Sequence, residues 1–291
     1  MKAFVIGVLM TGCATPLPVP DGVRKGLLAA LAPAGGQWAV YFQDLETGAE
    51  FALRADEEFH PASTLKVWVL LKVYQDAHDG KYTLDEEVEI SKTFPSAAKK
   101  DPRAFDVEPT AAAVAKALGR RMSVRALVEH MIVVSDNLAT NLLIRKAGGP
   151  GAVTACIRSL GIARSTVARY IMDEQAFNEG LSSAAFARDF GIVFGKLARG
   201  ELVSPSASRD MLAVLGRVRE NGMLPFRLPA GAKVLHKTGA IEGVRADVGL
   251  VTLPGGRQYV AAFLARGLRD EKAGEACLAA ASRVLYDFAA R

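Results

Sequence analysis

The sequence predicts an α+β fold in which both chain ends form one antiparallel sheet and the middle of the chain is helical. Strand-like segments occur near both ends, and apolar residues at helical spacing fill the region between them. The simplest packing covers the sheet with the first and last helices and leaves the middle as a separate helical lobe. A cleft between two such parts is a natural place for a site.

The composition is that of a globular protein. The chain has 291 residues, of which 50% are hydrophobic and 23% are charged, so it is not intrinsically disordered. No apolar run approaches the roughly 20 residues that a membrane-spanning helix needs. The net charge of +5 is modest, and the basic residues form no stripe typical of nucleic-acid binding.

A helix, a hairpin and a second helix are expected first. Asp21 can cap the first helix, and Pro33 with the two following glycines ends it. Two strands flank a turn at Glu46–Gly48, and a strongly apolar helix follows. The expected ranges are residues 21–31, 38–44, 50–54 and 63–77.

The middle and the end of the chain are expected to be helical and then to return to strands. Residues 92–121 are mixed, with two prolines, a KKDPR cluster and an alanine-rich piece. Ser123 caps the next helix. Further helices are expected at 137–147, 151–159, 183–198 and 206–218, strands at 233–237, 247–253 and 258–265, and a closing helix at 271–289.

Residues 1–12 resemble a targeting segment. A positive start is followed by the apolar stretch Ala3–Met10 and by small residues before Cys13. This pattern is similar to a bacterial lipoprotein signal, in which Cys13 becomes the lipidated N-terminus, followed by an extended linker at 13–20. A plain secretory signal or an incorrectly assigned start codon is the alternative. We therefore expect an exported protein, either periplasmic or anchored by lipid to the bacterial envelope.

The cysteines and histidines predict no metal and no cofactor. Cys156 and Cys277 lie in apolar helical patterns and are expected to be buried free thiols. The four histidines form no close pair with metal-ligand spacing.

Two segments have the form Ser-x-x-Lys, and their contexts differ. Ser96 follows a proline and precedes a charged stretch broken by proline. Ser63 opens an apolar helix, where Ser63 and Lys66 share one face. The positive end of that helix favours an alkoxide-like oxygen on Ser63 and a neutral amine on Lys66. An ordinary N-cap role is the alternative for Ser63.

Two further motifs occur once each and in a fixed order after the first. Ser135-Asp136-Asn137 lies at a junction between two expected helices, and Lys237-Thr238-Gly239 ends an expected strand. With Ser63-x-x-Lys66, these motifs make the chain resemble the class A β-lactamases, within the wider group of penicillin-recognising serine enzymes.

The resemblance covers roughly residues 22–290. It implies a β-lactamase/transpeptidase-like fold, with a five-stranded antiparallel sheet packed on the terminal helices and the site between this sheet and the helical lobe. The catalytic domain would then span 21–291, with an α/β lobe at about 21–62 and 220–291 and a helical lobe at about 63–219.

The resemblance also implies a role for each matching residue. Ser63 would be the acylated nucleophile, and Lys66 its proton acceptor or a relay to that acceptor. Ser135 would pass a proton to the leaving β-lactam nitrogen. Asn137 would bind the acyl-amide side chain of the substrate, and Asp136 would be a structural support.

Other matching residues would bind the substrate around this centre. The segment Lys237–Gly239 would hold the substrate carboxylate. The backbone N–H groups of Ser63 and Ala240 would form the oxyanion hole. Arg245 lies near the spacing of the family's carboxylate-binding arginine and would add positive charge, although strand alternation could instead point it at solvent.

The segment Glu174–Asn178 resembles the deacylation motif Glu-x-x-Leu-Asn, with Phe177 in place of leucine. Glu174 would activate the hydrolytic water, and Asn178 would help to position it. A solvated charge pair with Asp173 is the alternative. The stretch after Asn178, which the family closes with an Arg–Asp ion pair, is shortened here, while the segment between the first two motifs is about a dozen residues longer than usual.

We therefore expect a monomeric serine β-lactamase acting on a small-molecule β-lactam, with no nucleic-acid partner. A D-alanyl-D-alanine peptidase or a related serine esterase of the same superfamily is the alternative, and Glu174 and Asn178 argue against it. A non-catalytic penicillin-binding or peptidoglycan-binding module is the third possibility, and the intact residues Ser63, Lys66, Ser135 and Lys237 argue against that.

Overall fold

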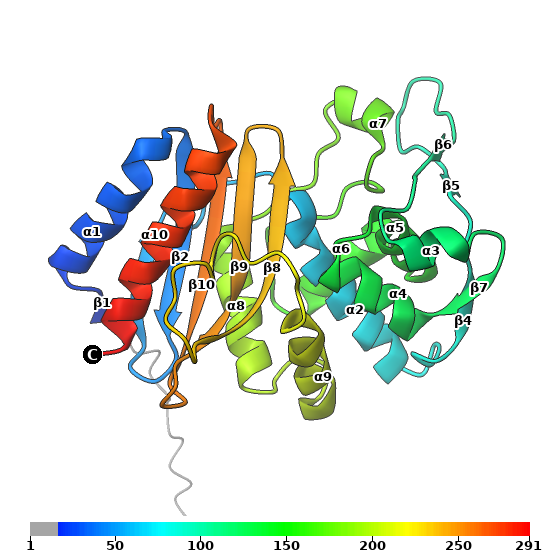
Figure 1. Ribbon diagram of the computed structural model, residues 1–291. Coiled ribbons are helices and arrows are strands. Elements are labelled where there is room, and N and C mark those ends of the chain that lie inside the picture. Colours follow the sequence, from blue (N-terminus) through cyan, green and yellow to red (C-terminus); the bar gives the residue numbers. More distant parts are fainter. Residues whose placement is uncertain (1–16) are drawn as a thin grey trace, which may run out of the picture.

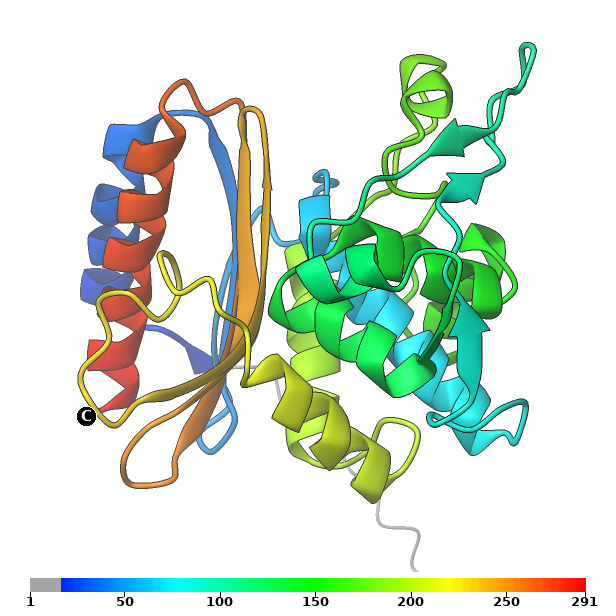
Figure 2. The same ribbon diagram turned by 45° about the vertical axis from the view of Figure 1, so that its right-hand side comes forward.

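The computed structural model describes residues 17–291, so the predicted signal segment 1–12 and Cys13 lie outside the described part of the chain. A central sheet carries two helices on one face, and the remaining helices lie on the other side (Figures 1 and 2). In the described residues, no helix is both long and apolar enough to span a bilayer, and no group of three His, Cys, Asp or Glu side chains could hold a metal ion.

The sheet has six strands in the order β1-β3-β2-β10-β9-β8. They are β1 (Leu17–Pro18), β2 (Gln37–Asp44), β3 (Ala49–Leu53), β8 (Lys233–Ile241), β9 (Val244–Thr252) and β10 (Gln258–Arg266). Five of them are antiparallel, and both chain ends contribute to this sheet, as predicted. The short β1 pairs in parallel with β3, so part of the expected linker at 13–20 extends the sheet edge.

Strands β8 and β9 are longer than predicted. The sequence pattern ended the first strand at Lys237, whereas β8 continues to Ile241 and pairs with β9 over its whole length. Gly243 has a φ of +65°, which permits a tight connection between the two strands. The extra length places the predicted motif Lys237–Gly239 within a strand rather than at its end.

Helices α1 (Asp21–Leu31) and α10 (Glu271–Ala289) cover the outer face of the sheet (Figure 2). Helix α8 (Ala187–Ala198) packs against β2, β9 and β10 on the inner face. A Cβ atom at Gly191 would lie 2.1 Å from the ring of Tyr41, so glycine allows this helix to approach the sheet. The expected start of this helix, residue 183, is wrong, because Ala184 and Ala185 form extended bridges instead.

The helical lobe surrounds α2 (Lys66–His78), of which ten residues among thirteen are buried. The longer helices around it are α4 (Val124–Val133), α5 (Asn137–Lys146), α6 (Pro150–Ser159) and α9 (Pro205–Leu215). The ring of Trp68 stacks on Phe190 of α8 at 4.5 Å, which joins this lobe to the sheet. Cys156 and Cys277 are buried free thiols, as predicted.

The middle of the chain is not wholly helical. The mixed region predicted at 92–121 holds short strands and one short helix. The short strands in and beside this region form two small ribbons: β4 (Glu87–Glu89) with β7 (Arg121–Ser123), and β5 (Thr93–Phe94) with β6 (Phe105–Asp106). The remaining short elements are η1 (Ala32–Ala34), η2 (Ala62–Leu65), α3 (Ala112–Lys116) and α7 (Glu174–Asn178).

Candidate active site

Ser63 lies in the 3₁₀ turn η2, directly before α2. Neither the turn nor α2 has a side-chain cap, so Ser63 is not an N-cap. Its side chain is partly exposed, while Thr64 and Lys66 are buried. The hydroxyl of Ser63 therefore remains accessible at the rigid start of a buried helix.

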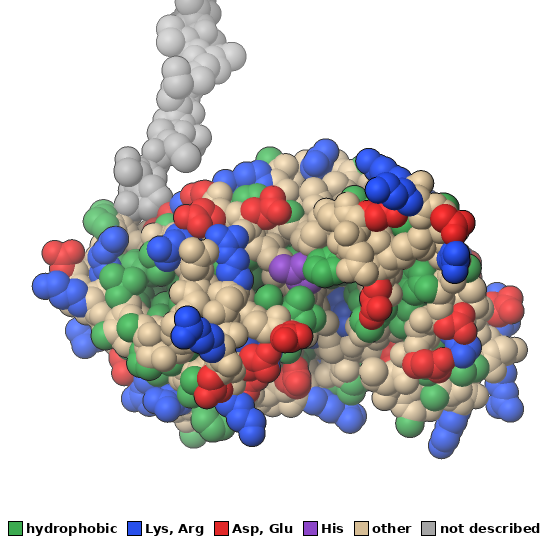
Figure 3. All heavy atoms as spheres, turned by 90° about the horizontal axis from the view of Figure 1, so that it is seen from above, with side chains coloured by type: hydrophobic (Ala, Val, Ile, Leu, Met, Phe, Trp, Pro, Cys, Tyr) green, Lys and Arg blue, Asp and Glu red, His purple; other side chains and the backbone are tan. Residues whose placement is uncertain are grey.

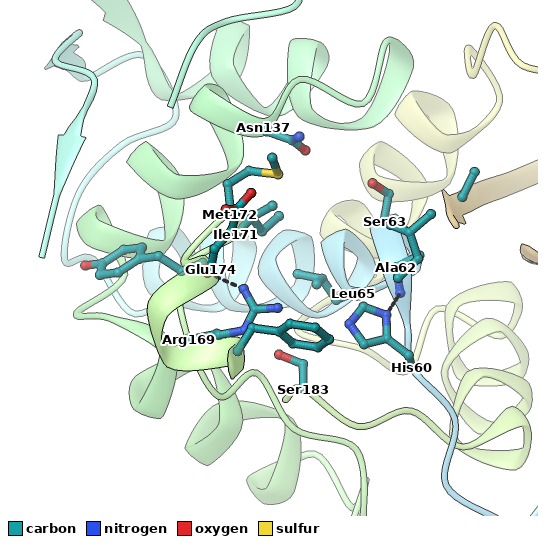
Figure 4. A pocket seen from close by; sticks show the side chains of 14 residues that line it. His60, Ala62, Ser63, Leu65, Asn137, Arg169, Ile171, Met172, Glu174 and Ser183 are labelled. Carbon is teal, nitrogen blue, oxygen red and sulfur yellow. Dashed lines mark hydrogen bonds between the residues drawn. The ribbon is translucent and has the colours of Figure 1, made fainter. Parts of the chain in front are cut away.

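Two adjoining cavities meet at this serine. The first is lined by residues of the segment 169–177 and by Asn137 (Figure 4). The second is lined by the end of α4, the loop after α9 and the segment Lys237–Ala240 of β8. Ser63 and Ala240 line both cavities. Seen from above, the surface is hollowed between the two parts of the molecule (Figure 3).

Strand β8 lies directly against the turn that carries the serine. A Cβ atom added to Gly239 would lie 3.0 Å from the backbone nitrogen of Ser63 and 3.0 Å from the carbonyl oxygen of Pro61. Only glycine allows this close approach without a shift of backbone. The approach explains why the backbones of Ser63 and Ala240, the predicted oxyanion-hole residues, border the same space.

Lys66 joins the first motif to the second. Its Nζ donates to the carbonyl oxygen of Ser135 at 2.6 Å, to Ser135 Oγ at 3.0 Å and to Asn137 Oδ1 at 2.9 Å. Burial, followed by the nearby charge of Lys237, lowers the pKa of Lys66 well below its ordinary value. The amine therefore gives up its proton far more readily than an exposed lysine does, while Ser135 lies within reach to relay that proton.

Three of the six described non-glycine residues with a positive φ lie around this centre. Ala62 precedes the serine and has a φ of +45°, Ser135 has a φ of +58°, and Met172 has a φ of +66° two residues before Glu174. Non-glycine residues rarely adopt this left-handed region, and such strain tends to gather at functional sites.

Asp136 is a structural support, as predicted. Its buried carboxylate accepts from Ala139 N at 2.7 Å and so caps α5. It also accepts from Thr110 N at 2.7 Å and Ala111 N at 2.8 Å. The carboxylate thereby fixes Ser135 and Asn137 at the junction of α4 and α5.

Lys237 and Thr238 line the second cavity. Burial lowers the pKa of Lys237 to about 8, although the carboxylates of Asp247 and Glu220 oppose this shift. Lys237 Nζ donates to the carbonyl oxygen of Thr238 at 2.9 Å. The hydroxyl of Thr238 donates to Glu220 Oε2 at 2.8 Å.

Glu174 is the first residue of α7 and lines the first cavity with Ser63 and Asn137 (Figure 4). Asp173 caps this short helix, accepting from Ala176 N at 3.1 Å. Although the loop after Asn178 is shortened, Glu174 still lies on the wall of the first cavity.

The long segment before the second motif holds α7 in place. Asp173 Oδ1 accepts from Ser96 Oγ at 2.7 Å, and Asp173 Oδ2 accepts from Ala97 N at 2.7 Å. Glu179 accepts from Lys99 N at 2.7 Å and Lys100 N at 3.1 Å. The second Ser-x-x-Lys segment, which we call the bracing segment (Ser96–Arg103), thus supports the loop that carries Glu174.

Arg169 closes the shortened loop from the other side. Its Nε donates to the carbonyl oxygen of Leu181 at 2.9 Å, and its guanidinium lies 5.0 Å from the ring centre of Phe177. Ser183 Oγ accepts from Ala168 N at 3.1 Å. These contacts link the two ends of the loop where the family uses an Arg–Asp ion pair.

Asn178 lies away from the predicted position. It ends α7, is exposed and lines neither cavity. None of the hydrogen bonds found in residues 17–291 uses its side chain. The five-residue helix turns Phe177, rather than Asn178, toward the cavity beside Glu174.

Arg245 also differs from its predicted position. Its guanidinium donates to Glu275 at 2.7 Å and Glu271 at 3.3 Å, both on α10, and it lines neither cavity. Residues such as Val251, which share its face of β9, pack in the core beneath α1 and α10. Strand alternation therefore points Arg245 to the outer face of the sheet, contrary to the predicted contact with the substrate carboxylate.

Among the cavity-wall residues that sequence reasoning missed are His60 and Glu220. His60 lines the first cavity, accepts from Ala62 N at 3.0 Å and meets the ring of Phe177 edge-on at 6.2 Å. Its position three residues before Ser63 was an available signal. Glu220 lines the second cavity, and no local pattern marks it, because the fold of the loop after α9 brings it to Thr238.

An accessible serine beside a buried, readily deprotonated lysine, in a cleft between a sheet and a helical lobe, defines a serine hydrolase. The family model described as the β-lactamase enzyme family matches residues 23–289. The chain belongs to this family, and within it to the class A serine β-lactamases.

Relatives agree with this assignment. A β-lactamase from Streptomyces albus G is 29% identical, covering 92% of this chain and 85% of its own length. The carbapenem-hydrolyzing β-lactamase KPC from Klebsiella oxytoca is 27% identical, covering 87% of this chain and 84% of its own. The solved structure of PBP-A is 25% identical, with a TM-score of 0.80 over 94% of this chain and 97% of that one. The similarities support serine β-lactamase activity of the class A type.

Proposed function

We propose that the chain hydrolyses β-lactams in two steps through an acyl-enzyme on Ser63. The observation that carries the proposal is the place of Ser63 between two cavities, with Lys66 and Ser135 on one side and Glu174 on the other. A nucleophile that is acylated and then released needs a proton acceptor within reach in each step, and this arrangement offers a separate group for each.

In the first step, Ser63 Oγ attacks the β-lactam carbonyl, and its proton passes, directly or by a relay, to Lys66 once that amine has given up a proton of its own. The C–N bond of the ring breaks, and Ser135 passes a proton to the leaving nitrogen. The hydrogen bond from Lys66 Nζ to Ser135 Oγ provides the route by which that proton is replaced. The backbone N–H groups of Ser63 and Ala240 stabilise the oxyanion, at about 3–4 kcal/mol per donor.

In the second step, Glu174 takes a proton from a water that attacks the ester carbonyl. The Ser63–acyl bond breaks, the serine recovers its proton and the ring-opened acid leaves. Asn137 contributes to both steps by binding the amide of the substrate. Its Oδ1 accepts from Lys66, so its Nδ2 is the atom that donates to the carbonyl oxygen of that amide. Lys237 and Thr238 hold the substrate carboxylate in the second cavity.

Mass measurement at short times after mixing with a penicillin tests this proposal. We expect an adduct that forms and then returns quickly to the free mass. A persistent adduct would instead favour the D-alanyl-D-alanine peptidase or penicillin-binding reading. No adduct at all would overturn acyl-serine chemistry for this chain.

We further propose that the protein is an exported monomer anchored by lipid on Cys13. The export and the lipid anchor rest on the sequence of residues 1–13 alone. Cys13→Ser is expected to move the enzyme from the membrane fraction to the soluble periplasmic fraction. Wild-type protein that is already fully soluble would contradict lipidation.

The charge of Lys237 predicts a pH dependence of substrate binding. Because its pKa is lowered to about 8, Lys237 is cationic below that pH and neutral above it. We expect kcat/KM for a penicillin to fall as the pH rises through about 8, relative to kcat/KM for the methyl ester of the same penicillin. The ratio of the two kcat/KM values cancels the titration of Lys66, because Lys66 acts on both substrates in the same way. A ratio that stays constant with pH would contradict the contact between Lys237 and the carboxylate.

The bracing segment predicts that Asp173 positions Glu174. Asp173→Asn retains the shape but sets an amide against the Ala97 N–H, so we expect kcat to fall about 10- to 100-fold. If only deacylation is slowed, KM falls with kcat and kcat/KM is unchanged. The matched control is Asp101→Asn, an exposed carboxylate of the same segment that pairs with Arg103. A parallel loss of kcat/KM in Asp173→Asn would indicate general damage to the fold instead.

A further inference from the structure

One carboxylate lies in a cavity whose other charged side chains are basic. The second cavity is lined by Lys237 and Arg219, and buried Lys66 lies beside it. Glu220 lines the same cavity. The negative charge of Glu220 raises the pKa of Lys66 and of Lys237, against the effect of burial. Its carboxylate therefore interacts electrostatically with both lysines.

Glu220 uses the donor that a substrate carboxylate would need. Thr238 Oγ1 donates to Glu220 Oε2 at 2.8 Å. A hydroxyl has one proton, so Thr238 cannot donate to Glu220 and to a bound carboxylate at the same time. Two carboxylates beside Thr238 would also repel each other.

The loop holds the backbone of Glu220 but leaves its side chain able to turn. Arg219 N donates to the carbonyl oxygen of Val133 at 3.2 Å. Leu224 N donates to the buried carboxylate of Asp247 at 2.9 Å. Between these anchors Glu220 is exposed, and its next neighbours are Asn221 and Gly222. The side chain can therefore leave Thr238 and reach solvent without a change in the fold.

We propose that Glu220 occupies the substrate-carboxylate subsite in the free enzyme and competes with that carboxylate for Thr238. This inference rests on the proposed function. Acylation by a substrate that bears a carboxylate then requires Glu220 to turn out of the cavity. A substrate without the carboxylate has no such requirement, so Glu220 is a specificity-determining residue that lowers the preference for anionic substrates.

The experiment compares a penicillin with its methyl ester in wild type, Glu220→Ala and Glu220→Gln. At a pH well below 8, where Lys237 stays cationic in every variant, we expect Glu220→Ala to raise kcat/KM for the penicillin about fivefold or more, which is the effect of removing one like charge at contact distance in water. The ester should change little. Glu220→Gln removes the charge but keeps an acceptor for Thr238, so we expect a smaller gain.

Glu242→Ala is the matched control, since Glu242 is exposed in the turn after β8 and lines neither cavity. Its kinetics with both substrates should equal those of wild type. Equal changes for penicillin and ester in Glu220→Ala, or no change for either, would overturn the competition. Failure of the proposed function is seen separately, because wild-type enzyme would then form no transient adduct with the penicillin.

Discussion

Replacing Ser63 with alanine is expected to abolish the covalent adduct with a penicillin and to lower turnover by about 10⁴- to 10⁶-fold. Among residues 17–291, no second hydroxyl shares these surroundings. Ser135 Oγ accepts from Lys66 Nζ, but its backbone is held at the junction of two helices and it lines only the second cavity. Intact-mass analysis of the variant after mixing, together with steady-state turnover, measures both effects.

Ser96→Ala is the matched control, because Ser96 opens the other Ser-x-x-Lys segment. Its hydroxyl donates to Asp173 and lies in the bracing segment, so this variant should still form the adduct on Ser63. Peptide mapping of the trapped adduct identifies the acylated residue directly. An adduct on any peptide that lacks Ser63 would contradict the assignment.

The arrangement of the sheet could be predicted from the sequence because it depends on strong local patterns. Apolar segments at both chain ends and helical spacing between them lead to one sheet and one helical lobe. The same holds for Ser63 and Lys66, whose three-residue spacing is a local relation, although Ser63 lies in the 3₁₀ turn η2 and α2 begins only at Lys66. Lys237 could be placed only through the family motif, since its contact with the centre depends on β8 passing beside η2.

Residues whose roles depend on the face of a strand or on the path of a loop could not be predicted in this way. Arg245 was misplaced because spacing along the chain does not specify which face of β9 a side chain occupies. The tight turn at Gly243 pairs Ala240 with Arg245 and directs the guanidinium to α10. Glu220 and the bracing segment were missed because their contacts join residues far apart in the sequence.

Glu174→Gln is expected to lower turnover by about 10²- to 10⁴-fold while Ser63 still becomes acylated, so the adduct should accumulate. Acylation and deacylation are separate steps, and a residue that serves only the second can be lost without blocking the first. Glutamine keeps the shape of the side chain and its place on the cavity wall but cannot accept the proton of the attacking water. Burst kinetics and intact mass distinguish this result from a general loss of activity.

Glu174 and Asn178 belong to one motif but lie in different surroundings in the structure. Asn178 is therefore a suitable control position for the Glu174 prediction. Both side chains are exposed, but Glu174 lines the cavity that contains Ser63, whereas Asn178 lies at the other end of α7 and lines neither cavity. We therefore expect Asn178→Ala to turn over within about twofold of wild type, because surface substitutions without such contacts change free energies little. Normal turnover in Glu174→Gln would contradict the general-base role. A wild-type enzyme that already stalls as the adduct would show that the braced loop holds Glu174 out of reach of the water, and the chain would then act as a peptidase-like acyl-enzyme former.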